Sequence, residues 1–214
     1  MLRKTIPVIL FFILFSTSSV FAANEHRPYI EAQIGAVFAE ENDAGPVSDM
    51  DFDTGIASAV AIGLDHGWRY AHARSELEFA YHQSDVDGGS LSGLKVTDGE
   101  VEALSLLLNL FYTIETGYSI TPYIMGGLGV AFLDIDNVTI AGTSFIEDSE
   151  FALAYQTGVG LDLPLTDSLS LDLSYRYFGT ADKEFENNTV SSSTKYFDFR
   201  YETHNALLGL RYKF

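Results

Sequence analysis

Apolar and polar residues alternate along this chain in segments of about ten residues. In the last segment, residues 203–214, every second residue from 206 on is apolar: Ala206, Leu208, Leu210, Tyr212 and Phe214. Residues two apart lie on the same face of an extended strand. The segment therefore predicts a β-strand with one apolar face and one mostly polar face.

The same alternation predicts eight strands in all. They cover residues 29–38, 55–64, 74–82, 100–112, 122–133, 151–163, 169–178 and 203–214. Short turns alternate with long connections, which cover residues 39–54, 83–99, 134–150 and 179–195. Such an even set of strands, each about as long as a tilted membrane crossing, is typical of outer-membrane barrels. We predict an all-β protein, an eight-stranded antiparallel up-and-down transmembrane β-barrel with four long extracellular loops.

The two faces of these strands differ in composition. One face is rich in Leu, Ile, Val, Phe and Tyr, as a lipid-facing wall requires. The other is small or ionisable, and its charged residues are Glu31, Arg74, Glu76, Glu78, Asp172, Arg176 and Arg211. A lumen of eight strands is just wide enough for side chains, and buried charges need partners. We interpret these residues as a lumen salt-bridge network; the alternative is a proton path, a gate or a catalytic carboxylate pair.

Aromatic residues gather at both ends of the predicted strands, where a ring can lie between lipid and water. We assign Tyr112, Tyr123, Tyr212 and Phe214 to the short-turn end, and Phe38, Tyr81, Phe132 and Tyr177 to the long-loop end. One conflict remains, because apolar residues fall on odd numbers from Phe197 to Tyr201 and on even numbers from Ala206. A shift of one residue exchanges the faces. We expect either a bulge within residues 202–205 or a segment that projects beyond the membrane.

The N-terminus is typical of a secretory signal peptide. Arg3 and Lys4 precede an apolar run of ten residues, Ile6 to Phe15, and small residues precede a cleavage site after Ala22. The run is too short for a spanning helix, although an N-terminal anchor is the alternative. We predict that residues 1–22 are removed and that residues 23–214 form the barrel. No later stretch approaches 18 apolar residues, so a membrane location requires a closed barrel.

Charge and cysteine content narrow the function. The chain has 12 Lys and Arg against 30 Asp and Glu, a net charge of −18, and it has no cysteine. The acidic excess argues against nucleic-acid binding, and the lack of cysteine excludes disulfides and thiolate metal sites. Residues 39–54 and 134–150 contain no Lys or Arg. We hypothesise that these acidic loops bind divalent cations or basic host surfaces.

Two candidate sites have weaker support. Asp49, Asp51 and Asp53 share one face and offer the oxygen ligands that Ca²⁺ prefers, but the downstream Glu of a calcium loop is missing. We favour a solvated acidic loop. His204 suggests a lipid-modifying hydrolase on the barrel wall, but no serine nucleophile accompanies it on its strand. We therefore expect no catalytic residues and no cofactor.

Several segments resemble a known family. The last residues, LLGLRYKF, resemble the C-terminal signal read by the outer-membrane assembly machinery through Gly209, Tyr212 and Phe214, although Leu207 stands where a polar residue is usual. The segments RSELEFAYH, NLFY, PYIMGGLGVAF, YQTGVGLDLPLTD and LSYRYF resemble the OmpA-like and opacity-protein-related barrels, often called the porin family. The resemblance implies a Gram-negative outer-membrane protein that acts as a surface antigen, an adhesin or an envelope-stabilising protein.

The sequence thus predicts a non-enzymatic outer-membrane protein that acts through acidic extracellular loops. A narrow porin-like channel for small solutes is the alternative, and a lipid-modifying enzyme ranks below it. The expected partners are outer-membrane lipid and lipopolysaccharide, the assembly machinery, and a host or surface ligand at the loops. We expect a monomer.

Overall fold

The structure is a computed structural model that describes residues 27–39, 47–52, 54–67, 72–91, 94–140, 143–181, 183–186, 196–199 and 201–214. The strands are β1 Arg27–Ala39, β2 Val47–Phe52, β3 Gly55–Asp65, β4 Ala73–Leu91, β5 Leu94–Thr113, β6 Thr121–Ile140, β7 Thr143–Pro164, β8 Leu169–Thr180, β9 Lys183–Glu186, β10 Tyr196–Phe199 and β11 Glu202–Lys213. Within these ranges, no helix has the length and apolarity to cross a membrane. The predicted signal peptide lies outside the described residues.

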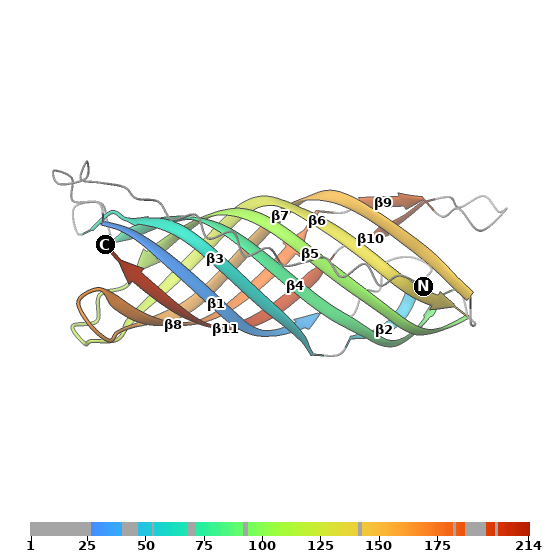
Figure 1. Cartoon of the computed structure of the whole chain (residues 1–214), viewed down its shortest axis with the longest axis horizontal. Coiled ribbons are helices and arrows are strands. Elements are labelled where there is room, and N and C mark those ends of the chain that lie inside the picture. Colours follow the sequence, from blue (N-terminus) through green and yellow to red (C-terminus); the bar gives the residue numbers. More distant parts are fainter. Residues whose placement is uncertain are drawn as a thin grey trace.

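Eight of these strands close into a barrel, which confirms the predicted fold class. The closed order is β1, β3, β4, β5, β6, β7, β8 and β11, and β11 pairs back onto β1. Every pairing is antiparallel. Figure 1 shows steeply tilted strands, with the C-terminus at the end of the barrel opposite the hairpin tips of β4–β5 and β6–β7. Closure removes the unpaired edges that lipid does not tolerate.

The wall of the barrel has an apolar outside and a largely polar inside. Large apolar side chains face outward, among them Ile34 and Leu110 at 62% exposed and Leu128 at 72%. Residues of the opposite parity face the lumen, where Arg176 and Arg211 are among the largest fully buried side chains. This arrangement reverses that of a soluble protein, in which charged residues are almost never fully buried. It fits a barrel surrounded by lipid.

The connections predicted as long loops contain much more strand than expected. Strands β4 and β5 stay paired up to Leu91 and Leu94, and β6 and β7 up to Ile140 and Thr143. Strand β2 pairs with β4, and β9 pairs with β10. The prediction of loops is therefore wrong for residues 83–91, 94–99, 134–140 and 143–150. Apolar alternation marks only the lipid-facing part of a strand, whereas backbone ladders continue in water without it.

The last barrel strand has no bulge, so the first explanation of its parity conflict is wrong. Strand β11 pairs with β1 and β8 residue by residue, without a register shift. Tyr201 faces the lumen in phase with Thr203 and Asn205, and all three are buried. The Tyr201 hydroxyl lies 3.2 Å from that of Ser84. The aromatic ring at this position thus belongs to the inside of the barrel, and not to its lipid face.

The aromatic residues at the barrel ends lie mostly where the sequence placed them, with one exception. Tyr123 is only 2% exposed and faces the lumen, whereas its neighbour Ile124 faces outward at 50% exposed. Its assignment to the girdle is wrong because its parity on β6 is that of the inner face. Four outward residues of the two predicted girdles are clearly exposed: Phe38, Tyr112, Tyr212 and Phe214.

Candidate functional site

The seven charged residues predicted for the lumen all lie inside the barrel, in the half near the short turns. None is more than 6% exposed. They come from β1, β4, β8 and β11, and the wall brings them together because each occupies the inward parity of its strand. The members are Glu31, Arg74, Glu76, Glu78, Asp172, Arg176 and Arg211.

The most buried ion pair of this network crosses the barrel from β8 to β4. Arg176 Nη1 lies 2.5 Å from Glu78 Oε2. The same carboxylate accepts a hydrogen bond from Gln156 Nε2 at 2.9 Å, and Gln156 also donates to Asn109 Oδ1 at 2.8 Å. Because these four residues come from β4, β5, β7 and β8, their contacts fix the cross-section of the barrel as well as neutralising the charges.

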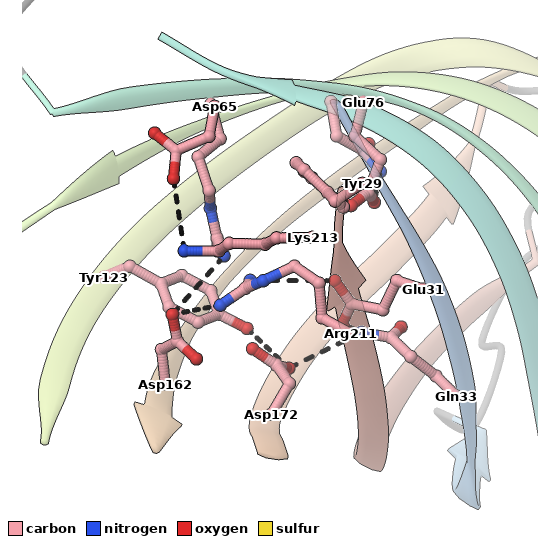
Figure 2. Close-up of polar contacts among 12 residues, drawn as sticks. Tyr29, Glu31, Gln33, Asp65, Glu76, Tyr123, Asp162, Asp172, Arg211 and Lys213 are labelled. Carbon is pink, nitrogen blue, oxygen red and sulfur yellow. Dashed lines mark hydrogen bonds and ion pairs between the residues drawn. The ribbon is translucent and has the colours of Figure 1, made fainter. Parts of the chain in front are cut away.

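A second cluster surrounds Arg211 near the short turns, as Figure 2 shows. Its guanidinium contacts Asp162, and its Nη1 lies 3.7 Å from Glu31 Oε2. Gln33 Nε2 donates to Glu31 at 2.6 Å and approaches Asp172 at 3.5 Å. One arginine therefore joins carboxylates from β1 and β7, and a glutamine extends the cluster to β8.

Arg74 joins the network through a carboxylate and through aromatic rings. Its Nη1 lies 3.8 Å from Asp162 Oδ2, and its guanidinium carbon lies 4.6 Å from the ring centre of Phe111 and 4.9 Å from that of Tyr123. Guanidinium groups are attracted to aromatic faces, and the attraction grows when water is excluded. Aromatic rings therefore share the stabilisation of this charge with the acidic residues.

Two lumen tyrosines donate hydrogen bonds to carboxylates. The Tyr29 hydroxyl donates to Glu76 at 3.0 Å, and the Tyr123 hydroxyl donates to Asp172 at 2.8 Å. Each ring lies across a glycine on the adjacent strand, Gly63 or Gly160, where a Cβ atom would overlap the ring. These two glycines are therefore required by close packing. They explain part of the glycine content of the inner face.

Sequence reasoning missed several members of the network. Asp162 lies on the polar face of its segment, the same face as Gln156. This alternation was the sequence signal that could have identified Asp162 as a lumen residue. Its place beside Arg211 depends on closure of the barrel. The other members missed are neutral and carry no charge pattern to reveal them: Tyr29, Gln33, Asn109, Tyr123 and Gln156.

The half of the lumen near the long connections is filled by apolar and aromatic side chains. Val37, Ala57 and Leu207 form a buried cluster. The rings of His82 and Phe178 stack with their centres 4.8 Å apart, and Phe178 packs edge-on against Tyr201. Additional side chains with no exposure come from β5 and β6: Ala103, Ala131 and Leu133. Above the charged network, the described side chains thus pack as a closed core.

The outer wall carries a small polar cluster between β7, β8 and β11. The Tyr175 hydroxyl lies 2.8 Å from His204 Nδ1, the Tyr177 hydroxyl donates to Glu202 at 2.6 Å, and the Tyr155 hydroxyl donates to the same carboxylate at 3.4 Å. His204, the residue considered as a hydrolase base, is thus held by tyrosine. We call these five residues the outer-wall cluster.

The C-terminal residues combine packing with exposure. Gly209 faces the lumen, where a Cβ atom would lie 2.8 Å from Gln33 Cγ and 3.1 Å from Glu31 Oε1, so packing alone favours glycine here. Tyr212 and Phe214 face outward, with ring centres 5.3 Å apart. The Phe214 amide donates to the Pro28 carbonyl at 3.0 Å and secures the chain end to β1. The role of Gly209, Tyr212 and Phe214 in assembly stays a prediction.

The weak calcium candidate falls where the structure gives no side-chain information. Asp49 and Asp51 lie on β2, but their side chains, like all of Asp53, lie outside the described residues. In the part of the chain that is described, no group of three or more His, Cys, Asp or Glu residues is placed to hold a metal ion. The calcium site therefore stays a prediction.

A closed barrel with an apolar wall and a buried polar interior defines an integral outer-membrane protein. The chain belongs to the family described as outer membrane protein beta-barrel domain, which matches residues 8–214. It is 26% identical over 174 residues to outer membrane protein PagN of Salmonella typhimurium, covering 74% of this chain and 73% of PagN. The protein is thus located in the bacterial outer membrane.

Solved structures show the same fold at low sequence identity. Neisserial surface protein A matches with a TM-score of 0.56 at 15% identity, covering 87% of this chain and 97% of that one. Ail, the attachment invasion locus protein of Yersinia pestis, in complex with the heparin analogue sucrose octasulfate, has a TM-score of 0.51 at 14% identity, covering 89% and 99%. OprG of Pseudomonas aeruginosa has a TM-score of 0.51 at 17% identity, covering 89% and 98%.

Proposed function

We propose that this protein is a non-catalytic surface protein that binds cationic partners through its acidic extracellular hairpins. The observation that carries the proposal is the filled lumen, which supports a role outside the barrel. The barrel then serves as a rigid base for the hairpins. A surface antigen or adhesin requires this arrangement, and an envelope-stabilising role through basic partners requires it as well.

The filling of the lumen supports this role over a channel. Leu133 and Phe178 are fully buried in the half near the long connections, and the Arg176–Glu78 pair crosses the other half. A solute would have to displace a packed core and then a buried ion pair. Breaking such a pair by removing one partner costs about 3–5 kcal/mol.

The paired extensions of β4–β5 and β6–β7 support display of the acidic residues. A hydrogen-bonded hairpin loses less conformational entropy on binding than an open loop does. The β6–β7 hairpin contains residues 134–150, with Asp134, Asp136, Glu147, Asp148 and Glu150 and no basic residue. Acidic residues on a preformed hairpin favour a basic partner through electrostatic complementarity.

One barrel of similar fold has been solved with a ligand, whose charge is opposite to the one proposed here. The Ail structure contains a heparin analogue that carries sulfates. Residues 134–150 of this chain contain five acidic residues and no basic residue, so a sulfated polymer would be repelled at this hairpin. We therefore propose a cationic ligand, either a basic protein surface or divalent cations.

The test uses the barrel in lipid nanodiscs and immobilised poly-lysine as the probe. A variant with Asp134→Asn, Asp136→Asn, Glu147→Gln, Asp148→Asn and Glu150→Gln should bind at least tenfold more weakly than wild type. A Thr139→Ser, Thr143→Ser variant keeps the charge and should bind as wild type does. Added salt should weaken wild-type binding, because exposed charges are screened. Equal binding by the neutralised hairpin, or binding insensitive to salt, would overturn the proposal.

Two measurements address the other functions. In planar bilayers, wild-type protein should show no steady single-channel steps, and reproducible conductance would favour the porin-like channel. In a deletion strain, the lipid A composition should stay unchanged. An altered acyl or headgroup pattern that returns to normal with the wild-type gene would favour a lipid-modifying enzyme.

We also propose that residues 1–22 are removed on export and that Phe214 is part of the assembly signal. Mass spectrometry of protein from the outer membrane should place the mature N-terminus at Ala23. Deletion of Phe214 should lower the amount of folded barrel in the membrane several-fold, whereas Lys213→Gln keeps the terminal aromatic residues and should not. Normal membrane levels of the truncated protein would contradict the assigned role.

A further inference from the structure

The lipid-facing wall contains a groove across β5, β6, β7 and β8. Its volume is about 790 Å³, within the usual range for small-molecule sites. The outward side chains along it are mainly apolar, and they include Leu110, Ile124 and Val159. Tyr175 and Tyr177 line its far side. Most of the lining residues have the outward parity, so the groove opens toward lipid, and the inward-parity residues Phe111, Met125 and Gly158 also border it.

The groove follows a single ladder of paired residues that climbs the wall. Leu110 pairs with Gly126, Gly126 with Thr157, Thr157 with Tyr177, and Tyr177 with His204. Leu110 is three residues from the short-turn end of β5, and His204 is nine residues from that end of β11. With about 3.3 Å per residue and a tilt of about 40°, the ladder rises from about 8 Å to about 23 Å.

A glycine creates the depression in the middle of this ladder. Gly126 faces outward, and a Cβ atom there would meet only the Gln156 carbonyl oxygen, at 3.9 Å. Packing therefore does not require glycine here, in contrast to Gly63 in the lumen. The Thr157 hydroxyl donates to the Met125 carbonyl at 3.1 Å, so it does not face lipid as an unpaired polar group. The floor of the groove is suited to a hydrocarbon chain.

The upper end of the groove meets the outer-wall cluster. Tyr175 and Tyr177 belong to both, and through their hydroxyls they contact His204 and Glu202. The apolar band of an outer-membrane barrel is about 25 Å tall, so this polar cluster lies at its outer edge. An apolar groove that ends in hydrogen-bonding groups at the lipid–water boundary matches the polarity of a lipid molecule.

We propose that the groove binds one acyl chain of lipid A and that the outer-wall cluster binds the region where this chain joins the sugar. In lipid A, amide N–H and hydroxyl groups occur at this depth, whereas the ester linkages of glycerophospholipids offer acceptors alone. The Glu202 carboxylate is an acceptor, and it selects ligands that carry donors. The site is independent of the acidic hairpins, so it goes beyond the function proposed above.

The test of the groove compares lipid binding by native mass spectrometry in a mild detergent. The probes are lipid A and phosphatidylcholine with matched acyl length, because the phosphatidylcholine headgroup has no N–H donor. Gly126→Leu fills the groove and should retain lipid A at least tenfold less than wild type. Ala32→Leu adds the same side chain to the exposed wall on β1 and should behave as wild type does. Heat-dependent gel mobility checks folding, and Val159→Trp replaces Gly126→Leu if that variant does not fold.

The test of the cluster uses Tyr175→Phe combined with Glu202→Gln. Wild type should prefer lipid A to phosphatidylcholine at least tenfold, and this double variant should bind both lipids within about twofold of each other. Undiminished lipid A binding by both groove-filling variants would overturn the proposal. Equal binding of the two lipids by wild type, or an equal loss in Ala32→Leu, would overturn it as well.

Discussion

The two halves of the lumen use opposite means to fill the same barrel. Near the short turns, three arginines and five carboxylates are packed together with tyrosines, glutamines and glycines. Near the long connections, the interior resembles the core of a soluble protein, with Val37 and Leu207 clustered with Ala57, and with Phe178 packed against His82 and Tyr201. The wall strands are continuous through both halves, so the difference lies entirely in the inward side chains.

This contrast separates stability from specificity. Apolar burial stabilises the barrel without defining which strand lies opposite which. Charged groups in a dry interior require particular partners, because an unpaired buried charge is costly. Arg176 and Glu78 connect β8 with β4, and Arg211 and Asp162 connect β11 with β7. We infer that the charged half sets the register and the closure, and that the apolar half supplies most of the stability.

The largest effect is expected from breaking the charged half at one partner. Arg176→Met leaves Glu78 buried without its cation and should lower the free energy of unfolding by about 3–5 kcal/mol. A double variant that also carries Glu78→Met should recover most of this loss, since apolar residues often replace a buried pair without cost. Urea titration in lipid vesicles, followed by gel mobility, measures both. A single variant as stable as wild type would contradict the division of roles.

A similar but smaller loss is expected in the apolar half. Leu207→Ala leaves a cavity beside Val37 and should lower the free energy of unfolding by about 2–4 kcal/mol. Leu208→Ala, one residue further along β11, faces lipid at 50% exposed and should cost clearly less. The same urea titration compares the two. A greater loss at Leu208 would show that the core near the long connections contributes little.

A single hydroxyl of the charged half should matter less than a whole charge. Tyr123→Phe removes the hydrogen bond to Asp172 and keeps the ring beside Arg74, so the loss should be about 1–2 kcal/mol. Tyr112→Phe makes the same change on the outer wall, and it should change stability by less than about 0.5 kcal/mol. If the two variants unfold at the same urea concentration, the lumen hydroxyl has no structural role.

The smallest effect is expected for an ion pair at the short-turn end of the barrel, where both side chains are partly exposed to water. Lys213 Nζ lies 3.2 Å from Asp65 Oδ2, and both side chains are a little over 20% exposed. Exposed ion pairs contribute about 0–1 kcal/mol, so Lys213→Ala should lie in that range and should lose its effect at high salt. Asp65→Asn should give a similar value. A loss near that of Arg176→Met would mean that burial does not distinguish the two pairs.

By itself, the sequence determined the parts of this protein that follow from parity. Burial with a period of two is a local signal, and it identified the barrel strands, the lipid face and all seven predicted lumen charges. This signal fails in the parts of the strands that lie outside lipid. Outside lipid, neither face must be apolar, so the extensions of β4 to β7 resembled loops. Tyr123 was misassigned because an aromatic residue suits a girdle and a packed lumen equally well, and Tyr201 caused a parity conflict because its ring faces the lumen.

Only the tertiary structure decided which groups meet across the barrel and which residues form sites on its wall. The Arg176–Glu78 pair spans 98 positions, and its partners lie on strands that are not neighbours in the sheet. Such pairs depend on the diameter and stagger of the closed barrel, which no local pattern contains. The groove at Gly126 likewise exists because pairing aligns one glycine with Leu110 and Thr157 on adjacent strands. Alternation assigns a residue to a face, and closure assigns its neighbours.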